Sequence, residues 1–297
     1  EEKEIQARYD AIKGSAVNPV LREGNSDRRA ARAVKNYAMA NPHSMGTWSH
    51  DSKTHVSSMT ESDFYSNEKS ATIAASQTGD SKIIFIADDG AVNVLKDNIH
   101  LEEGTIVDAT FMDSEALRVF LKTQISEAKK HNLLFSVHLK ATMMKVSDPI
   151  IFGHAVSSFF EKSFQKHNSA LEEIGANPNM GLGDILEKIS LKPEILRDFE
   201  AEMEDGPKMY MVDSDRGITN LHVPSDVIID ASMPALIRAG GKGWGPDGRP
   251  SDTKCVIPDN SYAPIYDETI KYFKETGALD PKTSGAVANV GLMAQKA

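Results

Sequence analysis

Cysteine is almost absent from this chain, which has 297 residues and a single cysteine, Cys255. This scarcity excludes an internal disulfide framework and is typical of a reducing compartment such as the cytoplasm. No CxxC or HExxH spacing occurs, so a structural zinc site is not expected. No run of about 18 apolar residues occurs, so no segment reads as a membrane span. A GxGxxG run after a predicted strand is also lacking, and Gly240–Gly243 has no P-loop spacing and is predicted to be a turn.

Positive charge is outnumbered by negative charge. The chain has 33 Lys and Arg against 43 Asp and Glu, a formal net charge of −10. That balance argues against nucleic acid or an anionic membrane as a partner, although a local basic pocket remains compatible with it. The hydrophobic fraction of 40% and charged fraction of 26% are typical of a soluble globular protein, of one large domain or two ordinary ones.

The apolar pattern alternates between helical and extended periods. An apolar run at 83–86 followed by Asp89-Gly90 predicts a hairpin, with 91–95 and 105–111 as candidate partners. Leu133–Leu139 reads as a buried strand. Asp148-Pro149 reads as an N-cap with proline at the first helical position. Further helices are predicted at 2–13, 29–40, 113–131, 182–189, 194–204 and 261–276, and further strands at 208–212 and 227–229. This order predicts an α/β fold with a mixed sheet flanked by helices.

The apolar stripes also predict what lies inside. Phe152, Phe159 and Phe160 form an aromatic stripe and are assigned to the core. Met143-Met144 and Ile265 are assigned to the core as well.

A loop at Gly14–Arg29 concentrates hydrogen-bond donors. Pro19 and two glycines interrupt any regular element there. The donors are Ser15, Asn18, Arg22, Arg28 and Arg29. Hydroxyl, amide and guanidinium groups together suit carboxylate or phosphate oxygens. The alternative is that the arginines are solvated and pair with Glu23 and Asp27.

Two further residues stand at the ends of predicted strands. Lys140 closes an apolar strand, where partial desolvation would make it a possible base. It could also simply leave the sheet for water, and Lys145 competes for the same role. Asp230 follows the apolar run at 227–229, where a carboxylate could bind Mg²⁺ or Mn²⁺ or could be a helix N-cap.

Long runs of residues resemble one family. These runs are Gly14–Arg29, Asn41–Gly46 with Trp48, His138–Pro149, Asp213–Asn220, Asp226–Pro234, Val256–Asp259 and Asn289–Ala297. They are distributed along nearly the whole chain, which resembles the monomeric NADP-dependent isocitrate dehydrogenases.

The resemblance implies a fold and a division into domains. We expect an isocitrate/isopropylmalate dehydrogenase-like α/β fold with an incomplete large domain. Residues 1–27 would be the end of the first, small domain with the substrate loop, and 28–297 most of the large second domain. Both ends are expected to be truncated, with the catalytic tyrosine and further metal ligands beyond Ala297.

The resemblance also implies roles for single residues. Ser15, Asn18, Arg22 and Arg28 would hold the carboxylates of isocitrate. Lys140 would bind substrate and take part in proton transfer, and Asp230 would be one ligand of Mg²⁺ or Mn²⁺. The implied reaction is oxidation by NADP⁺ followed by β-decarboxylation to 2-oxoglutarate and carbon dioxide. The cofactor-binding residues are not identified within this chain.

Two other functions remain open at this stage. One is a non-catalytic tricarboxylate-binding or scaffold domain derived from the same fold. The other is a metal-dependent β-decarboxylating dehydrogenase for another 2-hydroxy acid. The chain alone is expected to have little or no dehydrogenase activity, and the full-length protein is expected to be monomeric.

Overall fold

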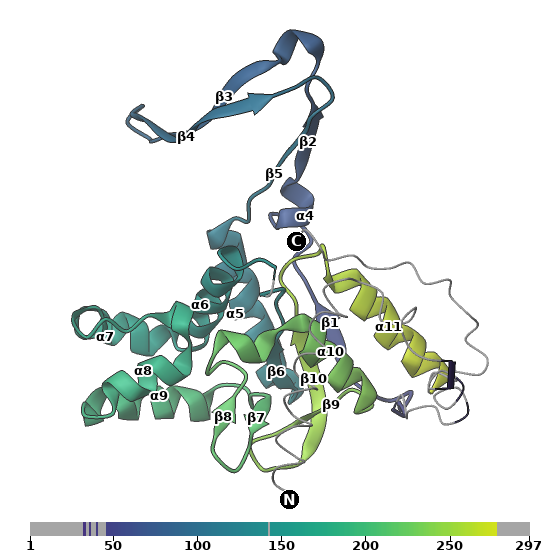
Figure 1. Ribbon diagram of the computed structural model, residues 1–297. Helices are drawn as coiled ribbons and strands as arrows, with labels where there is room; N and C mark the ends of the chain where they lie inside the picture. Colours follow the sequence, from purple (N-terminus) through teal and green to yellow (C-terminus); the bar gives the residue numbers. More distant parts are fainter. Residues whose placement is uncertain (1–31, 34–35, 37–39, 41–45, 142, 278–297) are drawn as a thin grey trace, which may run out of the picture.

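A small mixed sheet lies at the centre of the computed structural model, which describes residues 32–33, 36, 40, 46–141 and 143–277. Strands β1 (His55–Ser57), β10 (Pro250–Val256) and β6 (Leu134–Val137) lie in that order and run parallel. Strand β9 (Lys242–Trp244) pairs antiparallel with β10. Figure 1 shows this sheet in the middle of the main body. The predicted α/β class with a mixed sheet is confirmed.

The apolar character of the strands explains their central place. All four residues of β6 are buried, as expected for a parallel strand covered on both faces. The last four residues of β10 are buried too, and Cys255 pairs with Val56 on one side and Ser136 on the other. Of the segment Gly240–Gly243 that was predicted to be a turn, Gly240 and Gly241 form a turn at positive φ, whereas Lys242 and Gly243 belong to β9.

Helices surround this sheet. Asp113 caps α5 (Ser114–His131) by accepting hydrogen bonds from the N–H groups of Glu115 and Ala116, and Asn132 ends the helix in the left-handed region. Helix α5 packs against β6, β10 and α6, while α11 packs against β1. The other helices are α6 (Ser147–Phe159), α7 (Glu161–Glu173), α8 (Leu182–Ile189), α9 (Pro193–Asp205), α10 (Ile229–Arg238) and α11 (Ala263–Thr276). Short 3₁₀ segments are η1 (Ala75–Gln77), η2 (Pro178–Met180) and η3 (Pro224–Val227).

Two apolar clusters fill the body. The larger joins β6 to helices α5 to α9, and its aromatic centre of Phe135, Phe159, Phe160 and Phe199 has neighbouring ring centroids 4.9–5.9 Å apart. The smaller joins Trp48 to α10 and α11, with Ile270 and Phe273 inside. The predicted aromatic stripe of α6 is therefore core.

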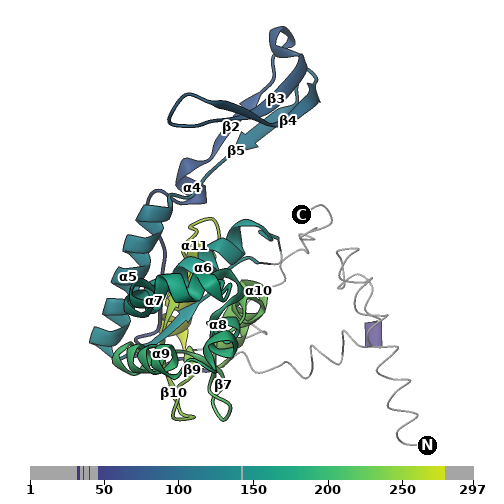
Figure 2. The same cartoon turned by 90° about the vertical axis from the view of Figure 1, so that its left-hand side faces the viewer.

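A pair of antiparallel ribbons projects from the body, as Figures 1 and 2 both show. After α4 (Phe64–Asn67), β2 (Lys69–Thr72) pairs with β5 (Ile106–Ala109), and β3 (Gly79–Ile86) pairs with β4 (Val92–Leu101). The predicted turn at Asp89-Gly90 is confirmed, and Gly90 has a positive φ. Of the two candidate partners, 91–95 pairs with β3, whereas 105–111 pairs with β2.

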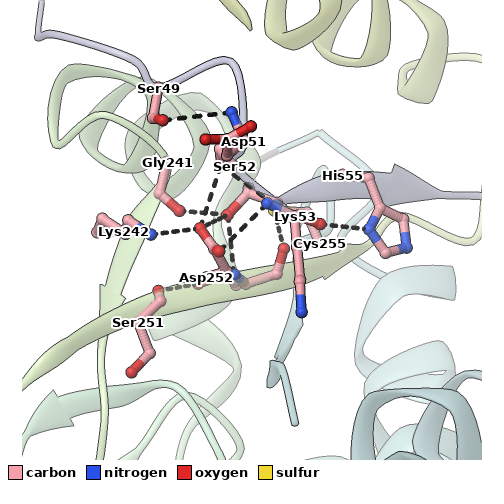
Figure 3. Close-up of polar contacts among 12 residues, drawn as sticks. Ser49, Asp51, Ser52, Lys53, His55, Gly241, Lys242, Ser251, Asp252 and Cys255 are labelled. Atoms are coloured by element: carbon pink, nitrogen blue, oxygen red, sulfur yellow. Dashed lines mark hydrogen bonds and ion pairs between the residues drawn. The ribbon is translucent and has the colours of Figure 1, made fainter. Parts of the chain in front are cut away.

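The amino-terminal edge of the sheet is held by one carboxylate. Asp252 of β10 accepts hydrogen bonds from Ser52 Oγ at 3.1 Å, the backbone N–H of Lys53 at 3.2 Å and Thr54 Oγ1 at 3.3 Å, and pairs with Lys242 Nζ at 2.6 Å. Figure 3 shows these contacts converging on Asp252 from the segment before β1 and from β9. Burial alone would raise the pKa of Asp252, but the hydrogen bonds from Lys242 and Lys53 outweigh it and leave the pKa below its usual value. This cluster ties three strands together.

Several local predictions are wrong. Asp148 is not an N-cap: α6 begins one residue earlier, at Ser147, and the carboxyl group of Asp148 is buried in its first turn. Residues 227–229 form no strand, because η3 runs into α10 with a single bridge between Ile228 and Leu139. Met143 is 41% exposed in the turn after Lys140, and Ile265 is 68% exposed on α11.

Some predictions fall outside the described residues. The helix at 2–13, most of the helix at 29–40 and the loop at Gly14–Arg29 are among them. The division into 1–27 and 28–297 stays a prediction. Among the residues that are described, no helix has the length and apolarity needed to cross a membrane.

Candidate functional site

The backbone brings two predicted site residues to one place. Leu139, just after β6, donates its N–H to Val227 O at 2.8 Å and accepts the N–H of Ile229 at 2.8 Å. This exchange locks the end of β6 beside the start of α10. Lys140 and Asp230 each lie one residue past the locked positions, so they emerge together at the carboxyl end of the sheet, where ligands bind in α/β folds.

Lys140 and Asp230 form an ion pair. Lys140 Nζ lies 2.5 Å from both carboxylate oxygens of Asp230. The lysine side chain is 15% exposed and the aspartate side chain 47% exposed. A largely covered ammonium group therefore meets a carboxylate that solvent still reaches. The structure does not send Lys140 alone into water, and Asp230 is neither a strand end nor an N-cap but a first-turn residue of α10.

Further ionisable groups surround this pair. Burial raises the pKa of Tyr262, and the charges of Asp259, Asp148 and Asp230 raise it further. Burial and the charge of Asp230 raise the pKa of Tyr266 in the same way. Both tyrosines are therefore neutral phenols at pH 7, and the negative charge of Asp230 acts on each of them.

Asp148 and Asp259 are the buried carboxyl groups of this region. Burial raises the pKa of Asp148 to about 6, with a contribution from Asp259, against the lowering effect of hydrogen bonds from Ser147 and the backbone of Lys140. Burial likewise raises the pKa of Asp259, which accepts hydrogen bonds from the N–H and hydroxyl of Ser261. The sequence analysis did not select these two residues or Tyr262. One signal was present: Asp259 follows the apolar strand β10 as Asp230 follows the run at 227–229.

The described residues offer only part of a metal site. No group of three or more His, Cys, Asp or Glu side chains within them could hold a metal ion. Asp230 supplies carboxylate oxygens, the ligand type that Mg²⁺ and Mn²⁺ prefer, and these oxygens already face one cation, the Lys140 ammonium. The donor chemistry fits one ligand of a divalent cation.

The other predicted substrate-binding residues are not described. Ser15, Asn18, Arg22 and Arg28 lie outside the described residues. Of the predicted site, the structure therefore brings together Lys140 and Asp230.

Comparisons with known proteins match the chain along its whole length. The family profile described as "Monomeric isocitrate dehydrogenase" matches residues 1–297. The chain is 56% identical over 301 residues to the isocitrate dehydrogenase [NADP] of Azotobacter vinelandii and 54% identical over 300 residues to that of Corynebacterium glutamicum. Each comparison covers 100% of this chain and 40% of the relative.

The chain belongs to the monomeric isocitrate dehydrogenase family. The resemblance seen in the sequence is thus confirmed. The chain spans about two fifths of the length of its curated relatives.

Among solved structures, the isocitrate dehydrogenase from Ostreococcus tauri in complex with isocitrate and magnesium(II) matches with a TM-score of 0.43 and 12% identity, over 77% of this chain and 46% of that one. The α/β fold of this chain follows from its own sheet and helices.

Proposed function

We propose that this chain is a segment of an NADP-dependent isocitrate dehydrogenase that oxidises isocitrate and decarboxylates it to 2-oxoglutarate and carbon dioxide. The observation that carries the proposal is the Lys140–Asp230 pair at the carboxyl end of the sheet. A base and an oxygen ligand side by side are the parts that a metal-assisted oxidation of an alcohol needs. The family match along the whole chain supports the same reaction.

Asp230 would hold a Mg²⁺ or Mn²⁺ ion together with ligands from outside the described residues. When bound, such an ion would polarise substrate oxygen atoms and stabilise negative charge on them. The half-exposed carboxylate of Asp230 can reach both a cation and a ligand from solvent.

Lys140 would hold and move a proton at Nζ. Its side chain is largely covered, and its backbone is fixed by the strand before it and by the turn after it, where Met143 and Met144 donate their N–H groups to Lys140 O. A positioned amine of this kind suits proton transfer at a substrate hydroxyl.

The remaining assignments are proposals carried by family membership. Ser15, Asn18, Arg22 and Arg28 would bind the carboxylates of isocitrate, because guanidinium and hydroxyl groups suit that geometry. NADP would be the hydride acceptor. A reducing, cytoplasmic location fits the single cysteine, Cys255, which is buried. The full-length protein would act as a monomer.

Steady-state kinetics of the full-length protein test the proposal. Lys140→Met and Asp230→Asn should each lower kcat for NADP⁺-dependent oxidation of isocitrate by about 100-fold or more. Lys145→Met, five residues away on an exposed turn, is the matched control and should keep most of the activity. Full activity in both site variants would overturn the proposal.

Calorimetry on the 297-residue chain separates an enzyme segment from a binding or scaffold domain. We expect isocitrate binding that depends on Mn²⁺, that Arg22→Ala abolishes and that is not followed by turnover. Metal-independent binding that survives Asp230→Asn would favour the tricarboxylate-binding domain. Measurable turnover by this chain alone would contradict its status as an incomplete enzyme.

A further inference from the structure

A hydrogen-bond network of buried polar side chains lies next to the Lys140–Asp230 pair in the sequence and in the fold. Asn220 Nδ2 donates hydrogen bonds to Ser136 Oγ at 2.9 Å and to Val137 O at 3.0 Å. Ser136 Oγ lies 2.8 Å from His138 Nε2, and His138 Nδ1 lies 2.7 Å from Ser232 Oγ. Asn220, Ser136 and His138 are at most 2% exposed. Polar groups so deeply buried are costly unless they have partners. Each of these side chains has at least one, although Asn220 Oδ1 has none among the described residues.

The donor and the acceptor of each hydrogen bond in this network can be assigned in turn. Ser136 Oγ accepts from Asn220, which leaves its own hydrogen free for His138 Nε2. Burial lowers the pKa of His138 to about 3, so the ring is neutral at pH 7 and has one N–H to give. That N–H is then on Nδ1 and points to Ser232 Oγ. The order is Asn220, Ser136, His138 and Ser232, each donating to the next.

The last two members of this hydrogen-bond network, His138 and Ser232, flank the site in sequence. His138 lies two residues before Lys140, and Ser232 lies two residues after Asp230. The backbone bond from Ile229 N to Leu139 O fixes α10 just before Asp230. The His138–Ser232 bond fixes it again just after Asp230. Asp230 is therefore held on both sides against the same strand end that presents Lys140.

We propose that His138 is a positioning residue, which through its hydrogen bond to Ser232 sets the first turn of α10 and so the carboxylate of Asp230 relative to Lys140. This inference rests on the proposed function, because its readout is the affinity of Asp230 for a divalent cation. Loss of a group that hydrogen-bonds a metal ligand directly lowers metal affinity or activity roughly 10–100-fold. His138 acts on Asp230 through the backbone of α10, so we expect the lower end of that range.

Two near-isosteric variants of His138 isolate the bond to Ser232. In His138→Asn the amide can occupy the place of Nδ1 and still donate to Ser232, whereas in His138→Gln the amide reaches only the place of Nε2 and Ser136. Ser232→Ala removes the same bond from the other side, and Ser232→Thr keeps the hydroxyl. Ser158→Ala is the matched control, because Ser158 Oγ is buried in α6 with no hydrogen-bond partner among the residues described.

The measurement is the Mn²⁺ dissociation constant of the full-length protein, from the electron paramagnetic resonance signal of free Mn²⁺, with a thermal melt of every variant. We expect His138→Gln and Ser232→Ala to weaken Mn²⁺ binding by about 10-fold or more. His138→Asn, Ser232→Thr and Ser158→Ala should stay within about 3-fold of the parent. In kinetics, the two weakened variants should need more Mn²⁺ for half-maximal rate.

The possible results distinguish the positioning role of His138 from the metal-binding role proposed for Asp230. If Asp230→Asn leaves the Mn²⁺ affinity unchanged, the proposed metal role of Asp230 fails. If Asp230→Asn weakens binding while His138→Gln and Ser232→Ala do not, the function stands and the positioning role is overturned. Variants that lower only the melting temperature would also overturn it, since a purely structural role predicts that result.

Discussion

Asp148 shows how burial changes the behaviour of one side chain. The residue is only 4% exposed. This burial, together with the negative charge of Asp259, raises the pKa of its carboxyl group to about 6. A raised carboxyl pKa means that the folded protein prefers the neutral form. The unfavourable contribution is absent below about pH 4, grows as the pH rises through 6, and is complete at pH 7.

Asp148→Asn should therefore stabilise the protein at neutral pH. The amide oxygen can still accept the N–H of Lys140, while the buried charge is removed. A shift of about two pKa units predicts a gain of about 1–3 kcal/mol in the free energy of unfolding at pH 7 and almost none at pH 4. Urea unfolding at both pH values measures it. Asp97→Asn, on an exposed strand, should change little at either pH, and an equal gain at both would contradict the explanation.

Lys140 and a divalent cation compete for the same oxygens of Asp230. Because Lys140 Nζ lies 2.5 Å from both of them, a metal ion must share or displace the ammonium group. Lys140→Met should accordingly strengthen Mn²⁺ binding in the absence of substrate by up to about 5-fold, because a partly exposed ion pair is worth up to about 1 kcal/mol. Weaker binding in this variant would show that Lys140 supports the metal site instead.

The sequence could single out Lys140 and Asp230 but could not show that they touch. Ninety residues separate them, and the contact arises from two backbone bonds around Leu139. The roles of Asp148 and Asp259 were equally hidden, because a carboxyl group in a sequence carries no sign of its burial. Asp148 followed by proline resembles a cap, and only the packing of α6 shows otherwise.

Asp252 makes three strands depend on one side chain. It joins the start of β1 to β9 and β10 through four donors (Figure 3). Its pKa is lowered, so it stabilises the fold above about pH 4, and this contribution is lost as the pH falls through and below that value.

Asp252→Ala should lower the free energy of unfolding by about 1–3 kcal/mol at pH 7, since buried donors lose a charged acceptor. The loss should shrink at pH 3. Chemical denaturation at the two pH values provides the measurement, with exposed Asp215→Ala as the control. A loss that does not depend on pH would assign the effect to packing.

Most helices could be predicted from their periodicity, and the short strands less well. Helix α5 begins after a capping aspartate and α9 begins with a proline, and α8 carries a clear apolar stripe, so their ranges were nearly right. The apolar triplet at 227–229 looks like a strand, but its backbone makes only one bridge before α10 begins. Which strand pairs with which depends on long-range contacts that local pattern does not encode.

At the scale of the molecule, the β3–β4 ribbon leaves most of its apolar side chains exposed. Its exposed apolar side chains are Ile83, Ile84, Phe85, Ile86, Val92, Val94 and Leu95, all more than 40% exposed. Figures 1 and 2 show the ribbon standing away from the main body. A two-stranded ribbon with this surface and two open edges invites association.

The 297-residue chain should therefore self-associate in solution, and a charged pair should prevent it. Ile84 lies directly opposite Val94, so Ile84→Lys with Val94→Glu places opposite charges in cross-strand contact. Light scattering after gel filtration should show a monomer for this double variant and larger species for the parent. Val119→Lys, at an exposed apolar position on α5, is the control. If this variant also became monomeric, the ribbon would not be the surface that causes association.

The single thiol of this chain, Cys255, can report how often the central sheet opens. Its thiol is fully buried in the central sheet, and burial raises its pKa well above the usual range, so a thiol reagent meets no reactive sulfur while β1, β10 and β6 stay together. Since the chain has no second thiol, the rate of alkylation under native conditions counts how often the sheet opens. Any variant or ligand that stabilises the sheet will lower the alkylation rate of Cys255, and no cysteine has to be introduced for the measurement.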